Sequence, residues 1–186
     1  MTDEIQFEAW PKIARLNRDI LITEKIDGTN AAVIITDDGR IAAQSRTRLI
    51  THEADNFGFA RWVRENEDAL ISALGPGRHF GEWWGSGIQR GYGLPKGEKR
   101  FSLFNAPRWS DVDLWTLLPG LGVVPILYEG PFSQLVINST VNNLRSYGSI
   151  AAPGFMKPEG IVVWHTAART SFKVTLENDE SPKGNG

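Results

Sequence analysis

Four charged residues stand inside or beside apolar runs that are typical of strands. They are Lys25 after ILITE, Glu82 within HFGEW, Glu159 before GIVVW and Lys173 within SFKVT. Taken alone, each is most simply a solvated strand end. Together they offer two amines, which can attack an electrophile or offset negative charge, and two carboxylates, which can accept hydrogen bonds or hold a metal ion. Their combination favours a reactive site over four unrelated surface charges.

Composition limits the kinds of protein to which such a site could belong. A chain of 186 residues is long enough for one well-buried core and favours a single domain. The net charge of -2 argues against a protein that coats nucleic acid with a basic surface, although a local basic groove is compatible with it. The absence of cysteine excludes disulfides, zinc thiolate sites and thiol catalysis, and the three dispersed histidines suggest no metal site.

The two ends of the chain carry no structural signal of their own. The first ten residues lack the pattern of a targeting leader, and no run approaches the length of a membrane span. We therefore expect a soluble protein without a membrane partner, either cytoplasmic or virus-encoded and acting in the cytoplasm of the host. Residues 177–186 are charged and rich in Pro, Gly and Asn, so this tail is expected to be disordered.

The N-terminal half predicts a sheet followed by a helix. Residues 20–24 and 31–36 are expected strands, and the turn signal DDGR at 37–40 predicts a hairpin that leads to a strand over 41–45. Apolar residues in helical spacing predict one helix over 53–74, ended by a Gly-Pro-Gly sequence. Trp10, in the irregular segment before the first strand, is expected to cover the core.

The C-terminal half predicts more strands and a second helix. Residues 132–147 are expected to be helical, with Ser133 as N-cap and Gly148 as terminator. The expected strands cover residues 78–84, 101–104, 112–118, 123–127, 159–164 and 171–176, with a glycine-rich loop over 85–97. The chain is therefore expected to have an α+β fold, with mostly antiparallel sheets flanked by helices.

The four charged residues also occur in a recognisable order. The series Lys25-Ile-Asp-Gly, Phe-Gly-Glu82, Glu159-Gly-Ile-Val-Val and Phe-Lys173-Val resembles the motifs of covalent nucleotidyltransferases, the superfamily of ATP-dependent RNA and DNA ligases and mRNA capping enzymes. A four-residue lysine signature is weak alone, but four motifs in order over some 150 residues are specific. The sequences GTN at 28–30 and GEWWGSGIQRG at 81–91 are most similar to the nick-sealing type of RNA ligase.

The resemblance implies a fold and a domain boundary. Residues 1–176 are expected to form one nucleotidyltransferase (adenylylation) domain, with the ATP-grasp-like fold of ligases. Thirteen residues follow Lys173, too few for the OB domain of DNA ligases or the helical C-terminal domain of larger RNA ligases. The expectation is a catalytic domain without an OB domain, whose substrate binding a partner protein or domain could supply.

The resemblance also implies a reaction, an ATP-dependent joining of RNA 5'-phosphate and 3'-hydroxyl ends, as in RNA repair. Lys25 would attack ATP and carry AMP as a phosphoramidate, so the site must favour its neutral amine. Lys173 would meet the α-phosphate. Glu159 would bind Mg2+ or Mn2+, mostly through water, and is expected to be partly neutralised by the metal rather than left bare beside Lys25.

Five further residues are implied to contact the nucleotide. Glu82 would accept hydrogen bonds from the ribose hydroxyls, and Arg46 would contact the ribose or the phosphate beyond it. Phe104 would stack on adenine, with Phe101 as the alternative and plain core packing as the simpler explanation. Glu24 and Asn30 flank the lysine and would position the base and the metal waters.

Departures from the family pattern leave alternatives open. Ser171 stands where the family usually has a second lysine, and Asn105 where it usually has aspartate. A basic cluster in the glycine-rich loop (Arg90, Lys96, Lys99, Arg100) could follow an RNA backbone or simply be solvated. The alternative functions are a DNA ligase, a GTP-using capping-type transferase, and a non-catalytic module that binds nucleotide or nucleic acid.

Overall fold

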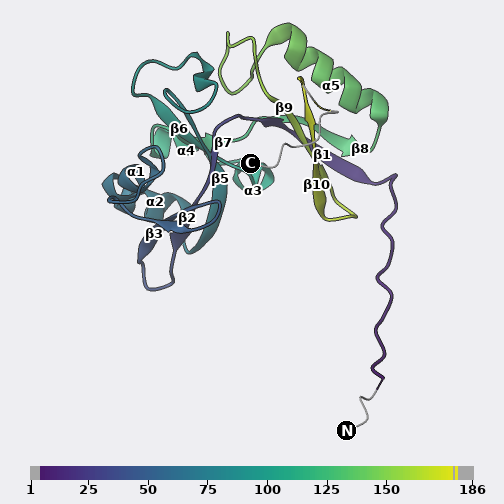
Figure 1. Ribbon diagram of the computed structural model, residues 1–186, viewed down its shortest axis with the longest axis horizontal. Coiled ribbons are helices and arrows are strands. Elements are labelled where there is room, and N and C mark those ends of the chain that lie inside the picture. The colour runs from purple at the N-terminus through teal and green to yellow at the C-terminus, as the bar shows by residue number, and fades with distance from the viewer. Residues whose placement is uncertain (1–4, 178, 180–186) are drawn as a thin grey trace.

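The structure, a computed structural model, describes residues 5–177 and residue 179. Two sheets lie side by side with helices on their outer faces (Figure 1). A four-stranded sheet has the order β10 (Thr170–Thr175), β9 (Gly160–His165), β1 (Asp19–Lys25) and β8 (Ile126–Pro131). A six-stranded sheet has the order β4 (Leu49–Ile50), β3 (Ile41–Ser45), β2 (Thr29–Ile35), β5 (Gly77–Gly85), β6 (Lys99–Leu103) and β7 (Leu121–Val123).

The strand pairing agrees with the predicted class. Every neighbouring pair is antiparallel except β6 and β7, which run parallel. The β2–β3 hairpin is confirmed, with Ile35 opposite Ile41. In its turn, Gly39 takes a φ of 80°, and the side chains of Thr36 and Arg40 bond Asp38. The α+β fold with mostly antiparallel sheets is thus confirmed.

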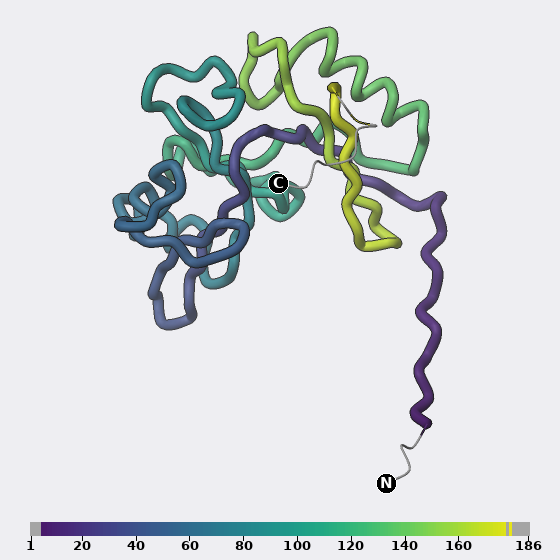
Figure 2. The backbone as a smooth tube through the Cα atoms, in the orientation of Figure 1, coloured from purple at the N-terminus to yellow at the C-terminus, as the bar shows by residue number. Residues whose placement is uncertain are grey.

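The chain crosses between the two sheets at two places. The first crossing, residues 26–28, joins β1 to β2, and the second, residues 124–125, joins β7 to β8. The end of β1 contacts the second crossing, because the amide of Glu24 donates to the carbonyl of Pro125 at 2.9 Å. In Figure 2 the purple chain passes from one lobe to the other at the first crossing. Lys25 is the last residue of β1 and therefore stands at the junction of the sheets.

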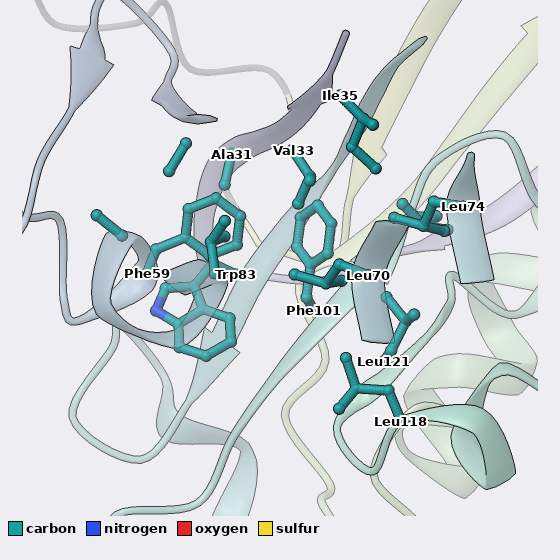
Figure 3. Close-up of a cluster of buried hydrophobic side chains, with 14 of the residues drawn as sticks. Ala31, Val33, Ile35, Phe59, Leu70, Leu74, Trp83, Phe101, Leu118 and Leu121 are labelled. Carbon is teal, nitrogen blue, oxygen red and sulfur yellow. The ribbon is translucent and has the colours of Figure 1, made fainter. Parts of the chain in front are cut away.

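The six-stranded sheet buries one face under helices. Alternate residues of β2 point into this core, as the period of a strand requires. Figure 3 shows Val33 of β2 near Phe59, Leu70, Trp83 and Phe101, all at most 2% exposed. The covering helices are α1 (Phe59–Glu65), α2 (Glu67–Leu74) and α4 (Leu114–Leu117).

The four-stranded sheet packs against one long helix. α5 (Gln134–Tyr147) begins at Ser133, whose hydroxyl accepts from the amide of Val136, and ends at Gly148, with φ 81°. Both caps are as predicted. Ile137, Val141 and Leu144 of this helix pack on apolar residues of β1 and β9. Two short helical segments, η1 (Gly91–Gly93) and α3 (Ala106–Trp109), lie in the connections around β6.

The strand predicted over 123–127 is divided, because residues 124–125 join β7 of one sheet to β8 of the other. Three further local predictions were wrong. The helix predicted over 53–74 begins only at Phe59 and breaks at Asn66, whose φ of -119° and ψ of 24° are not helical. Both the backbone amide and the side chain of Asn66 donate to the carbonyl of Trp62 there. The strand predicted over 112–118 contains α4, because Asp113 caps it by accepting from the amide and hydroxyl of Thr116.

Trp10 is the third error, since it is 87% exposed rather than covering the core. It lies in the N-terminal segment 5–18, which extends away from the sheets in Figure 2.

The ends of the described chain add two observations. Within residues 5–177, no helix is both long and apolar enough to cross a membrane. Of the predicted tail 177–186, residues 178 and 180–186 lie outside the described residues. Asp179 accepts from the amide of Thr175 at 2.8 Å, so the start of the tail contacts the end of β10.

Candidate active site

Lys25 and Glu159 meet because of the strand register. β1 and β9 pair so that Lys25 lies opposite Gly160, which brings the preceding Glu159 beside the lysine. The Nζ atom of Lys25 lies 2.6 Å from Oε2 of Glu159, and the two side chains are 25% and 17% exposed. The two groups thus form a direct ion pair, and partial neutralisation of Glu159 by a metal stays a prediction. A protonated amine cannot attack, so nucleophilic chemistry at Lys25 requires Glu159 to engage another partner.

Glu82 lies on the adjacent sheet and is bonded to the segment that follows the lysine. Strand register places it opposite Asn30. Its two oxygens accept from the amide of Gly28 at 3.0 Å and from the side-chain nitrogen of Asn30 at 2.9 Å. Burial raises the pKa of Glu82 to about 7, against the opposing effects of the Lys25 charge and these two hydrogen bonds. This carboxyl group therefore changes charge near neutral pH.

Gly28 is required by the close approach of two chain segments. A Cβ atom at this position would lie 2.4 Å from the carbonyl oxygen of Trp83 and 2.7 Å from Cβ of Trp84. Because the segment after Lys25 passes this close to β5, the amide of Gly28 reaches the carboxylate of Glu82. The glycine of the lysine motif is thus explained by the close packing of the first crossing against β5 of the six-stranded sheet.

Glu24 points away from the ion pair of its neighbour, since successive strand residues face opposite sides. It is 1% exposed. Its carboxylate accepts from the hydroxyl of Ser149 at 2.6 Å and from the amides of Ile150 and Ala151 at 2.8 and 3.0 Å. These contacts tie the end of β1 to the loop after α5. A contact of Glu24 with a base stays a prediction.

The remaining predicted residues come from three separate strands or strand ends. Arg46 directly follows β3, and Lys173 lies in β10, opposite Val162 of β9. Phe104 directly follows β6 and is 41% exposed, whereas Phe101 is fully buried in the core. The alternative assignment of Phe101 as a stacking residue therefore has no accessible ring to support it.

Eight predicted site residues, Phe101 not among them, border one cleft between the two sheets. Its volume of about 840 Å³ lies in the range that suits small-molecule ligands. The cleft brings together cations, carboxylates and one exposed aromatic ring, the groups needed to hold a phosphorylated nucleotide. Both departures from the family pattern, Ser171 and Asn105, also line it. The predicted site residues that line the cleft are Glu24, Lys25, Asn30, Arg46, Glu82, Phe104, Glu159 and Lys173.

Sequence reasoning missed that two residues of the glycine-rich loop, Arg90 and Tyr92, bind Asp27 of the lysine motif. We call these two residues the clamp. Arg90 of the glycine-rich loop pairs with the carboxylate of Asp27 at 2.9 Å and donates to the carbonyl of Lys157 at 3.1 Å. The hydroxyl of Tyr92 accepts from the amide of Asp27 at 2.9 Å, and burial raises the pKa of this tyrosine. The sequence marked this loop only by its glycines and charges, because its partners lie more than 60 residues away.

The clamp also changes the interpretation of the basic cluster in that loop. Arg90 is held by Asp27, and Arg100 is held by Glu98 at 2.6 Å. Arg100 also lies 5.5 and 5.1 Å from the ring centroids of Trp84 and Trp115. Two of the four cations therefore have structural partners.

The donors in the cleft fit a hard divalent cation held largely through water. In residues 5–177 and 179, no group of three or more His, Cys, Asp or Glu side chains could hold a metal ion by itself. Glu159 and Glu82 nevertheless supply carboxylate oxygens at the cleft. Mg2+ commonly uses one or two carboxylates together with waters and substrate phosphates, so this donor set is suitable.

Comparison with known proteins supports this interpretation. A family model described as RNA ligase matches residues 18–175. Comparison with curated proteins gave no match.

Solved structures show the same fold. A mutant of the Naegleria gruberi RNA ligase with AMP and Mn has a TM-score of 0.64 and 22% identity, over 90% of this chain and 53% of that chain. A mutant of the same ligase with ATP and Mn has a TM-score of 0.62 and 22% identity, over 89% and 52%. An apo mutant of this ligase has a TM-score of 0.63 and 22% identity, over 89% of this chain and 53% of that chain. The chain thus spans about half the length of these proteins.

Proposed function

The chain belongs to the RNA ligase family, and on that premise we propose that it is an ATP-dependent RNA ligase that works through AMP bound covalently to Lys25. The proposal is carried by one observation: eight residues, dispersed from 24 to 173 in the sequence, line a single cleft. A module that only bound nucleotide would have no need of an amine at the junction of the two sheets.

In the proposed first step, the neutral amine of Lys25 attacks the α-phosphorus of ATP. A nitrogen–phosphorus bond forms, the bond to the β-phosphate oxygen breaks, pyrophosphate leaves, and the amine gives up a proton. Such a transfer depends on in-line positioning and on neutralising the charge of the phosphate oxygens. Lys173 and Arg46 border the cleft and carry the positive charge for that task.

The nucleoside is held by the six-stranded sheet. Glu82, already fixed by Gly28 and Asn30, presents carboxylate oxygens that can accept from ribose hydroxyls. Phe104 offers a partly exposed ring for the adenine.

Glu159, with Glu82 nearby, would hold the divalent ion, Mg2+ or Mn2+. When bound, that ion supplies charge neutralisation for the phosphate oxygens. The ion and Lys25 would compete for Glu159, because the carboxylate that would bind the ion is the one that pairs with Lys25.

The later steps consume the AMP on Lys25. A 5'-phosphate of RNA attacks the phosphorus of the lysyl-AMP, which frees the amine and gives an RNA end capped by AMP through a pyrophosphate bond. A 3'-hydroxyl then attacks the 5'-phosphate, forms the phosphodiester and expels AMP. Sealing of cleaved RNA is the process in which such a reaction serves repair.

Retention of label tests the first step. The protein is incubated with ATP or GTP labelled at the α-phosphate and with Mg2+ or Mn2+, then denatured, and the label on the chain is measured. We expect label from ATP, lost in Lys25→Ala and kept in Lys12→Ala, an exposed lysine outside the cleft. Label that survives Lys25→Ala would overturn the assignment of the nucleophile. Label from GTP alone would favour the capping-type alternative.

Joining assays test the substrate. The protein is given breaks in RNA and, separately, an all-DNA nick, each with a 5'-phosphate and a 3'-hydroxyl. We expect RNA 3'-hydroxyl ends to be sealed faster. Equal sealing of the all-DNA nick would refute the preference for RNA.

A further inference from the structure

A second, smaller pocket adjoins the nucleotide cleft. It has a volume of about 210 Å³, and Phe104 and Asn105 line both hollows. A molecule that leaves the cleft past Phe104 therefore enters this pocket directly. Because a water molecule occupies about 30 Å³, the pocket has room for one ring-sized or phosphate-sized group and not for a folded ligand.

The pocket exists because two neighbouring strands differ in length. β6 pairs with β5 only from Gly81 onward, whereas β5 begins at Gly77. The amide of Phe104 donates to the carbonyl of Phe80 at 3.0 Å, and the chain then turns away into α3. Residues 78–80 pair with β2 on one side but have no strand on the side of β6, and the hollow forms there, between them and α3.

The pocket carries positive charge. Arg78 and Arg108 line it, and both are exposed. Within residues 5–177 and 179 neither forms a salt bridge, in contrast to Arg90 and Arg100. The guanidinium of Arg108 lies 4.7 Å from the ring centroid of Trp109, which holds it over an apolar surface. Two arginines at one hollow are suited to phosphate oxygens.

Two aromatic rings stand next to these arginines. Phe80 is 51% exposed and Phe104 is 41% exposed. Phe80 and Glu82 are two residues apart on β5, so their side chains lie on the same face of the sheet, the face that borders the nucleotide cleft. An aromatic ring left half in water beside cations is the combination that single-stranded nucleic acids use, with bases stacked on the ring and phosphates on the cations.

We propose that the Arg78–Arg108 pocket binds the single-stranded RNA end that is to be joined, with one unstacked base against Phe80 and its phosphodiester on the two arginines. The inference rests on the proposed function, because it places the RNA beside the cleft in which AMP would be transferred. It assigns to this chain a binding site for RNA outside the nucleotide cleft.

Direct binding tests the pocket without relying on catalysis. A short single-stranded RNA with a 5'-phosphate and a 3'-fluorophore is titrated with protein, and anisotropy is followed at several salt concentrations. Arg78→Ala and Arg108→Ala should each lower the slope of log affinity against log salt by about 0.7, the value for one phosphate contact to a single strand. Phe80→Ala should weaken binding by about fivefold or more with the slope unchanged. Arg40→Ala, an exposed arginine paired with Asp38 in the β2–β3 hairpin, is the matched control and should bind as the wild type does.

The readouts separate this inference from the proposed function. Retention of label from ATP should be unchanged in all four variants, which also shows that each is folded. Wild-type affinity and salt slope in the Arg78 and Arg108 variants would overturn the pocket as an RNA site while leaving the ligase proposal intact. If the wild type takes no label from any nucleotide but RNA binding depends on the two arginines, the ligase proposal fails and the RNA site stands. If Phe80→Ala weakened the binding of a fully paired RNA duplex by the same factor, the proposed contact of an unstacked base with Phe80 would be overturned.

Discussion

Nζ of Lys25 lies 2.6 Å from the carboxylate of Glu159, which precedes the residue paired with the lysine across the sheet. The carboxylate is therefore fixed beside the amine by backbone register rather than by a flexible loop. The contact holds the amine of Lys25 in the cleft.

The first prediction concerns Glu159→Gln. The amide of glutamine pairs less well than the carboxylate with the ammonium group of Lys25 and with a divalent ion. We therefore expect the rate at which label from ATP is attached to the chain to fall by about a hundredfold. Raising the concentration of Mg2+ should recover part of the rate. Glu129→Gln, an exposed carboxylate on β8 of the same sheet, is the control. Labelling at the wild-type rate and the same metal dependence would contradict the assigned role.

The second prediction concerns the charge of Glu82. Its pKa of about 7 in the folded protein lies above the ordinary value of 4.5. Between pH 4.5 and about 7 the carboxyl group of Glu82 is protonated in the folded state but ionised in the unfolded state. The free energy of unfolding therefore falls as the pH rises through this range. Glu82→Gln removes this effect, which is worth up to about 3 kcal/mol. Urea denaturation of both proteins across this range measures it, with Glu65→Gln as control. If the free energy of unfolding depended on pH in the same way in wild type and Glu82→Gln, the raised pKa of Glu82 would be contradicted.

The third prediction concerns Gly28→Ala. The added Cβ would meet the carbonyl oxygen of Trp83 at 2.4 Å, so the first crossing must shift away from β5. We expect a loss of about 1–3 kcal/mol in the free energy of unfolding, together with slower labelling of Lys25. Gly122→Ala is the matched control, because a Cβ there meets nothing within 4 Å. Equal stability of the two variants would mean that the close approach is not rigid.

The fourth prediction concerns Arg90→Ala. Both members of its ion pair with Asp27 are over a quarter exposed, so its loss should change stability by no more than about 1 kcal/mol. Labelling of Lys25 should nevertheless fall by about tenfold, since misplacing a reacting group by a small distance reduces the rate strongly. Arg64→Ala, on α1, is the control. A large loss of stability with an unchanged rate would make the clamp structural only.

The fifth prediction concerns Ser171→Lys. Ser171 lines the cleft two residues from Lys173 on the same strand, so a lysine there adds positive charge on the side of the nucleotide. We expect the KM for ATP in the labelling reaction to fall by about three- to tenfold at low salt, and less at high salt. Thr170→Lys, whose side chain alternates to the other face, should leave KM unchanged. An unchanged KM in Ser171→Lys would show that the phosphates do not pass this position.

Much of the site could be predicted because its signals are short and local. A lysine before a glycine, or a carboxylate within an apolar strand, is visible in a few residues, and strand alternation then decides which side chains face the cleft. That alternation places Glu82 opposite Ser102, so Phe104, two residues further along, shares its face and Phe101 does not. The choice between the two phenylalanines follows from this register, which only the structure supplied.

The errors arose where a side chain or a distant contact decides the outcome. The apolar run at 112–118 resembles a strand until Asp113 caps the backbone of Thr116 and turns it into α4. Burial of Trp10 depends on a surface to pack against, which no pattern within the segment can reveal. Likewise, the partners of Glu24 lie 125–127 residues away, so its sequence neighbours gave no hint of them.

Within residues 5–177 the main chain joins the two sheets at residues 26–28 and 124–125, and Lys25 stands directly before the first of these connections. If one sheet rotates against the other about these connections, each side chain moves in proportion to its distance from the rotation axis. Lys25, at the junction, moves least, and groups far out on the strands, such as Arg46 and Lys173, move most. A rotation of this kind would change the width of the cleft while displacing Nζ of Lys25 little.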